Sequence, residues 1–253
     1  MKKILILLIA IPVFIACSSD DDVNTIPATL TFKFDHNWDG EPFNQDDLGL
    51  TTFVNANGDE LMIERLRYLV SNIRLYKENG SSTLLQGYQL VDVSSTGSLT
   101  FSLNENIPDG DYNFISFTFG FSEQYNTSGI YSDLNSTSWN WPENLGGGYH
   151  FLQIDGLYET VEGPQPFNFH MGTARISEGM FEANYAEIFF AQDFTMDGNK
   201  TFPIKMNVAE WFKNPNTWDL NEFNTNLMGN YEAQKMMNEN AGSVFSLGPV
   251  TSP

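Results

Sequence analysis

The stretch ATLTFKFDH, residues 28–36, decides the expected fold, because apolar and polar side chains alternate along it without a break. Successive side chains of an extended strand point to opposite faces, so the leucine and the two phenylalanines of this stretch share one face with His36. The stretch is therefore predicted to be a half-buried β-strand that carries a histidine on its core face.

The same alternation predicts further strands along the chain. It recurs in three segments, residues 115–121, 149–154 and 202–208. In the second of them, His150 is predicted to share a face with Leu152 and Ile154. Turns are predicted at the dipeptides Asn57-Gly58, Asn79-Gly80 and Asp197-Gly198.

Helical spacing of apolar residues is confined mainly to residues 224–239, with a shorter piece at 209–212. Strands separated by turn signals at such intervals are typical of a sandwich. The sequence therefore predicts an all-β fold, an Ig-like β-sandwich with a short C-terminal helix. We expect it to occupy residues 28–253 as one domain.

The start of the chain predicts export and lipid attachment. Lys2 and Lys3 precede an apolar run from residue 4 to residue 16, which is shorter than the ~20 residues that a membrane-spanning helix needs. The run ends at Cys17, the only cysteine, in a sequence that resembles the lipobox of bacterial lipoproteins. Residues 1–16 are therefore predicted to be a lipoprotein signal peptide, and residues 17–27 a lipidated cysteine with an acidic tether.

The acidic run at residues 18–22 leaves the direction of anchoring open. It resembles a signal for transfer to the cell surface, and it equally suits a solvated tether. We expect an outer-membrane lipoprotein that faces either the periplasm or the medium. Its formal net charge of −20 argues against nucleic acid as a partner, because the chain has no basic patch to pair with phosphates.

The three histidines, His36, His150 and His170, are the candidate metal ligands. All three lie in aromatic, strand-like segments, and imidazole is a common ligand of late transition metals. Three neutral imidazoles would suit copper, as Cu(I) or Cu(II), or zinc with one open position. The alternative is that each histidine is a hydrogen-bonded core residue.

Several neighbours of the histidines are candidates for supporting or modified residues. Asp35 and Asp155 could orient an imidazole, although strand alternation points each away from the histidine in its own strand. Met171 could supply a thioether or fill the core. Among the tryptophans, Trp38 follows His36 closely, whereas Trp139 and Trp141 precede His150 by more than a turn can bridge.

Five segments carry a resemblance to a known family: LRYLVSNIRL (66–75), IPDGDY (107–112), FTFG (117–120), WNWP leading to GYHFLQIDG (139–156), and FHMG (169–172). Their order is similar to that of the MbnP-like family, which includes the methanobactin-associated protein and the copper-repressed surface proteins of methane-oxidising bacteria. The resemblance extends over roughly residues 28–247.

The resemblance implies a lipoprotein or secreted β-sandwich that binds copper through histidines. It places His150 and His170 at family motif positions and His36 in an early strand. In some members a tryptophan is oxidised to kynurenine, a step attributed to a partner diheme enzyme related to MauG. This sequence departs from those members because no tryptophan is separated by one residue from a following histidine.

The sequence thus predicts a lipid-anchored, extracytoplasmic copper-binding protein that acquires or sequesters the metal. It contains no His-Glu-x-x-His pair and no Gly-x-Ser-x-Gly elbow, so no enzymatic activity is expected. Two alternatives remain open beside zinc binding. One is a surface module that binds a glycan or a protein through exposed aromatic rings, and the other is a structural tether in a larger complex.

Overall fold

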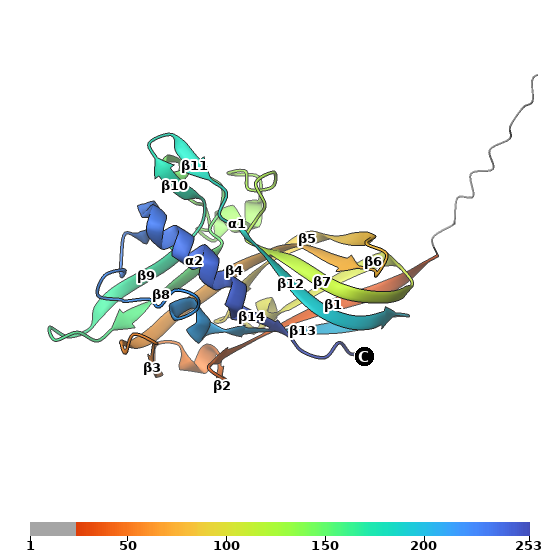
Figure 1. Cartoon of the computed structure of the whole chain (residues 1–253), viewed down its shortest axis with the longest axis horizontal. Helices are drawn as coiled ribbons and strands as arrows, with labels where there is room; N and C mark the ends of the chain where they lie inside the picture. The colour runs from red at the N-terminus through yellow and green to blue at the C-terminus, as the bar shows by residue number, and fades with distance from the viewer. Residues whose placement is uncertain (1–23) are drawn as a thin grey trace, which may run out of the picture.

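The computed structural model describes residues 24–253 and shows two large β-sheets, a separate two-stranded sheet and a C-terminal helix (Figure 1). The predicted all-β sandwich ending in a short helix is confirmed. The predicted signal peptide, Cys17 and most of the acidic tether lie outside the described residues.

The first sheet is built around β1 (Thr25–Trp38), which contains the alternating stretch. Its strands follow the order β14-β13-β1-β2, and β6 pairs with the first part of β1. Strands β1 and β13 run parallel, which places Phe32 opposite Phe202 and His36 opposite Met206. The other strands of this sheet are β2 (Glu41–Phe43), β6 (Thr100–Pro108), β13 (Lys200–Asn207) and β14 (Phe245–Leu247).

The second sheet follows the order β12-β7-β4-β8-β9, so β9 lies at an edge, and β3 and β5 also pair with the long strand β4. Its strands are β3 (Thr52–Val54), β4 (Glu60–Tyr76), β5 (Ser82–Asp92), β7 (Gly110–Phe119), β8 (Leu152–Tyr158), β9 (Gln165–Met171) and β12 (Ala186–Met196).

The register of this sheet decides which side chains face the core. Tyr68, Leu152 and Met171 lie side by side on β4, β8 and β9, and all three are fully buried. The neighbouring row is Arg67, Gln153 and His170. Because successive side chains of a strand alternate, this second row points to the outer face of the sheet.

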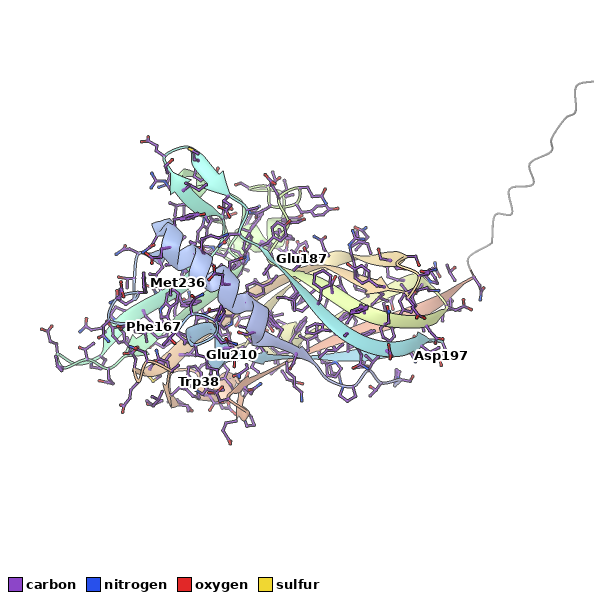
Figure 2. The ribbon with its side chains drawn as sticks, viewed as in Figure 1. Trp38, Phe167, Glu187, Asp197, Glu210 and Met236 are labelled. Carbon is purple, nitrogen blue, oxygen red and sulfur yellow. The ribbon has the colours of Figure 1, made fainter. Side chains whose placement is uncertain are left out.

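Aromatic rings from both sheets fill the space between them. Phe32 stacks on Phe202 with ring centroids 4.9 Å apart, and Tyr68 stacks on Phe119 at 6.1 Å. Figure 2 shows Trp38 and Phe167 toward one end of the long axis and Asp197 toward the other. Burial of such rings supplies the main favourable term of folding.

Helix α2 (Tyr231–Val244) begins later than residue 224, the start that the sequence predicted. The Asn230 side chain accepts a hydrogen bond from the Ala233 amide and so fixes the first turn. The short helical piece forms as η4 (Val208–Phe212). In the described range 24–253, no helix is long and apolar enough to cross a membrane.

The remaining elements are short. They are η1 (Gln45–Asp47), η2 (Thr96–Leu99), α1 (Ser132–Ser136), η3 (Glu143–Leu145), η5 (Leu227–Gly229), and the strands β10 (Ala174–Ser177) and β11 (Met180–Glu182). Strands β10 and β11 form a separate antiparallel hairpin that projects from the body (Figure 1).

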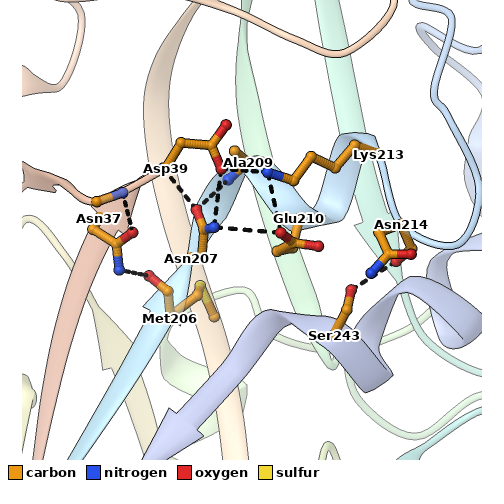
Figure 3. A network of polar contacts seen from close by, with 10 residues as sticks. Asn37, Asp39, Met206, Asn207, Ala209, Glu210, Lys213, Asn214 and Ser243 are labelled. Carbon is orange, nitrogen blue, oxygen red and sulfur yellow. Dashed lines mark hydrogen bonds and ion pairs between the residues drawn. The ribbon is translucent and has the colours of Figure 1, made fainter.

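A polar network holds the β1–β2 turn against η4 (Figure 3). The Asp39 amide donates to the Asn207 side-chain oxygen at 2.9 Å. Lys213 forms ion pairs with Asp39 and with Glu210, the second at 3.1 Å. These contacts fix the turn that follows β1.

Candidate metal centre

The outer face of β8 and β9 carries His170 and Asp155. His170 belongs to the outward row of β9, and its Nε2 lies 2.7 Å from Oδ1 of Asp155 on β8. The same carboxylate accepts a hydrogen bond from Asn168 at 2.8 Å and pairs with Arg65 at 3.2 Å. Asp155 therefore supports a histidine of the neighbouring strand rather than His150 of its own segment.

His150 lies beside His170, with ring centroids 5.3 Å apart and ring planes at 82°. The sequence predicted His150 within a strand, on the face of Leu152 and Ile154, and this prediction is wrong. Strand β8 begins only at Leu152, after a bend at Phe151. The bend releases His150 from the alternation of β8 and lets its ring reach the outer face.

Two tryptophans contact His150, although the sequence spacing indicated that they lie too far upstream. An isolated antiparallel bridge joins Asn140 to Tyr149, and it folds the segment 139–141 back onto the residues before β8. The ring centroid of Trp141 lies 4.9 Å from that of His150 at 81°, and that of Trp139 lies at 5.5 Å. Both indoles thus border the histidine pair.

Each imidazole has one nitrogen fixed by an acceptor. The Nδ1 of His150 lies 3.1 Å from the Trp139 carbonyl oxygen, and because a carbonyl only accepts, this nitrogen carries the proton. The Nε2 of His170 likewise donates to Asp155. In the neutral rings, Nε2 of His150 and Nδ1 of His170 therefore keep their lone pairs, as is typical of metal-binding histidines.

The electrostatics favour neutral His150 beside a charged Asp155. Burial, followed by the proximity of His170, lowers the pKa of His150 to about 4. Burial raises the pKa of Asp155, but the hydrogen bond and proximity of His170, the hydrogen bond from Asn168 and the proximity of Arg65 together lower it, so the net direction is downward. At neutral pH the site offers an unprotonated ligand and an ionised acceptor behind its neighbour.

The structure does not bring His36 to the other two histidines. His36 Nε2 lies 3.0 Å from the Tyr68 hydroxyl, and Tyr68 belongs to the inward row of β4, whereas His170 belongs to the outward row of β9. The predicted three-histidine site is therefore not assembled. His36 occupies the core environment that the sequence left open as the alternative.

Three other candidate residues also lie away from the histidine pair. Trp38 is buried and stacks on Phe53 with centroids 4.6 Å apart. Asp35 is exposed on the first sheet. Met171 is fully buried on the inner face of β9 and packs in the core rather than offering its sulfur beside His170.

Two residues that the sequence did not single out, Arg67 and Gln153, share the outward row with His170. Arg67 donates to the Gln153 side chain, and its guanidinium carbon lies 5.2 Å from the centroid of the Trp139 ring. Such an arrangement is a cation–π contact. The alternation of LRYLVSNIRL contained this signal, because Arg67 must point away from Tyr68.

The described residues contain no group of three or more His, Cys, Asp or Glu side chains that could hold a metal ion. The candidate donors are thus the two imidazoles of His150 and His170. With metal–nitrogen bonds of about 2.0 Å, two imidazoles on one ion have ring centres roughly 4.5–6.3 Å apart, depending on the angle between the two bonds, and the 5.3 Å observed lies within this range. Protein zinc sites use three or four protein ligands, so the pair alone supplies fewer ligands than such a site.

The tryptophans form no exposed aromatic platform. Trp139, Trp141, Trp211 and Trp218 are at most 1% exposed, and Trp38 is 8% exposed. The alternative of a glycan-binding surface built from these rings loses its basis, because stacking on a sugar needs an accessible ring face.

The buried histidines predict a loss of stability in acid. Burial lowers the pKa of His36 to about 4, as it does for His150. Between the ordinary histidine pKa of about 6.5 and the folded value of about 4, the unfolded chain binds more protons than the folded one. The free energy of unfolding therefore decreases as the pH is lowered through this range. We expect a loss on the order of 3 kcal/mol for each histidine between pH 7 and pH 4.

Urea unfolding at a series of pH values measures this loss. The variant His36→Gln has no titratable group at this position. Its free energy of unfolding should therefore decrease less between pH 7 and pH 4, by the contribution of one histidine. Equal declines in the two proteins would contradict the assignment to His36.

Comparisons with known proteins agree with the architecture. A family model described as MbnP matches residues 27–231. Among solved structures, MbnP from Methylosinus trichosporium superposes with a TM-score of 0.58 at 13% sequence identity, over 89% of this chain and 99% of that chain. At this identity the likeness concerns the fold alone. No curated protein matches the chain.

Proposed function

The chain belongs to the MbnP family, and from this premise we propose that it binds copper through His150 and His170. The observation that carries the proposal is the geometry of the pair. The rings lie 5.3 Å apart, and each has one nitrogen fixed by an acceptor, which leaves the other available to a metal.

The setting of the pair supports copper as the cargo. Two imidazoles without a thiolate or a third protein ligand underfill a zinc site, and at equal supply the Irving–Williams order favours copper over zinc. The side chain of His170 is 15% exposed, so an ion can reach the pair from solvent. The function proposed is acquisition or sequestration of copper, with no catalytic step.

Lipid attachment at Cys17 completes the proposal. The basic residues, the apolar run and the cysteine follow one another in the order of a lipoprotein signal. Several acyl chains exceed what stable membrane anchoring needs. The folded body would then work outside the cytoplasm at the outer membrane, on its periplasmic or its outer side.

A diheme enzyme related to MauG, which the family resemblance implies, is the proposed protein partner. Trp139 and Trp141 are the indoles that contact His150. They are therefore the side chains on which we place any oxidation to kynurenine.

Metal analysis of the purified full chain tests the copper assignment. The protein is exported in cells supplied with both copper and zinc, extracted in mild detergent and measured by mass spectrometry. We expect near-stoichiometric copper in the unaltered protein and in His36→Gln, because His36 lies apart from the pair. The double variant His150→Ala and His170→Ala should lose the copper.

The matched histidine variants make the result specific. Copper that disappears in His36→Gln but persists in the double variant would contradict the proposal. So would stoichiometric zinc in place of copper, or an unaltered protein that carries no metal.

A further inference from the structure

Helix α2 contributes a buried amide to the strand that carries His170. We propose that Gln234 is a positioning residue that holds both histidines of the pair in their binding geometry. The inference rests on the proposed function for its metal readout, whereas its structural part concerns the metal-free protein. Gln234 is fully buried, so its hydrogen bonds are not in competition with water.

Gln234 completes the free edge of β9 in the manner of a neighbouring strand. Its Nε2 donates to the His170 carbonyl at 2.7 Å, and its Oε1 accepts from the Gly172 amide at 3.1 Å. Backbone groups two residues apart point to the same side of a strand. The Met171 carbonyl, between them, points to the other side, where it accepts from the amide of Phe151, the residue before β8. One side-chain amide thus supplies the donor and the acceptor that a peptide group would offer.

Further contacts fix the orientation of the Gln234 amide. Its Nε2 also donates to the Leu227 carbonyl at 3.2 Å, and its Oε1 lies 3.4 Å from the Asn184 side-chain nitrogen. A flipped amide would face two carbonyls with its oxygen and leave buried polar groups unpaired, which is unfavourable. The Gln234 amide, bonded to the His170 carbonyl and the Gly172 amide and called the clamp below, therefore has one orientation.

The clamp acts directly on His170. Its ring is already tied to Asp155 through Nε2, so the direction of Nδ1 depends on where the backbone of β9 lies. Gln234 fixes that backbone at the carbonyl of His170 itself. Displacements of about 0.5 Å already degrade a binding geometry.

The clamp acts on His150 through Gly172 and Trp141. A Cβ atom added at Gly172 would lie 2.5 Å from the Trp141 indole, which shows that the indole packs directly on this glycine. Trp141 also contacts the His150 ring, with centroids 4.9 Å apart. Movement of the Gly172 backbone would therefore shift the indole that borders His150.

Two matched substitutions in α2 test the inference on the full chain in detergent. Gln234→Met removes the clamp at similar volume. Asn240→Leu is the control, because Asn240 is also fully buried in α2 but bonds the Trp211 carbonyl and the Asn216 backbone instead. The readouts are the imidazole ¹⁵N signals of the metal-free protein and competition for Cu(I) against bathocuproine disulfonate.

We expect Gln234→Met to shift the signals of both His150 and His170 and to weaken Cu(I) binding by about 10–100-fold, the usual effect of losing a residue that orients a metal ligand. Asn240→Leu should lower the melting temperature but leave the signals unmoved and the affinity within about threefold, because distant sites act independently. Unmoved signals in folded Gln234→Met would overturn the inference.

A second variant covers the case in which Gln234→Met fails to fold. Gly172→Ala leaves Gln234 intact and presses on Trp141, so it should move the His150 signals more than those of His170. Unmoved His150 signals in folded Gly172→Ala would overturn the step through Trp141. An unaltered protein that binds no Cu(I) would defeat the proposed function, and the signals of the metal-free variants would still decide the role of Gln234.

Discussion

Replacing Gly156 by alanine is expected to destabilise the fold by at least about 3 kcal/mol, the upper part of the range for overpacked sites. Gly156 lies in β8 opposite Ile63 of β4. A Cβ atom at this position would lie 2.0 Å from the Met62 carbonyl oxygen and 2.8 Å from the Phe167 ring. The backbone oxygen belongs to the central strand and cannot rotate away, so β4 and β8 must separate.

Chemical denaturation of Gly156→Ala and Gly242→Ala measures the effect with a control of opposite sign. Gly242 lies in α2, where an added Cβ meets nothing within 4 Å. Alanine there should stabilise the protein by roughly 0.5–1 kcal/mol through helix propensity. Equal stability of the two variants would contradict the close approach of β4 and β8.

The strands could be predicted from the sequence because their signal is local. The alternation of residues 28–36 depends only on which side chains a strand buries, and β1 follows it with Leu30, Phe32 and Phe34 in the core. The parallel pairing of β1 with β13 could not be predicted in this way. It joins segments that lie far apart in the sequence and leaves no mark on either alone.

The candidate site could be predicted only in part, because it depends on which face of its sheet each histidine occupies. The alternation placed His36 correctly on the core face, and this position removes it from the outward row that contains His170. His150 escaped the alternation argument through the bend before β8. A shift of one residue along a strand moves a side chain to the other face of the sheet, and a single sequence does not show how the strands are paired. This is why the sequence could not separate His36 from the other two histidines.

The tryptophans show the complementary limit. Their spacing in the sequence predicts that Trp139 and Trp141 lie too far from His150 for contact, yet the bridge between Asn140 and Tyr149 brings both indoles to it. Sequence distance limits contact only while the intervening chain stays extended. Here a short loop returns the chain antiparallel, so the residues face one another across the bridge.

Replacing Asp155 by leucine is expected to weaken copper binding by about 10–100-fold, as for other residues that hold the outer nitrogen of a ligating histidine. The carboxylate accepts the Nε2 proton of His170 at 2.7 Å. Without this acceptor, the imidazole can rotate or carry its proton on Nδ1, the nitrogen that we propose binds the metal. Asp155→Asn should weaken copper binding less than Asp155→Leu, because an amide oxygen still accepts a hydrogen bond.

Competition for Cu(I) against a chromophoric chelator ranks these variants, with Arg65→Met as the control. Arg65 pairs with the same carboxylate at 3.2 Å, but its side chain is 53% exposed, and exposed ion pairs contribute little. Its loss should change the affinity by less than about fivefold, the factor that corresponds to about 1 kcal/mol. If folded Asp155→Leu binds copper as tightly as the unaltered protein, His170 is oriented without the carboxylate. If Arg65→Met loses as much affinity as Asp155→Leu, the effect comes from surface charge rather than from the proton held on Nε2.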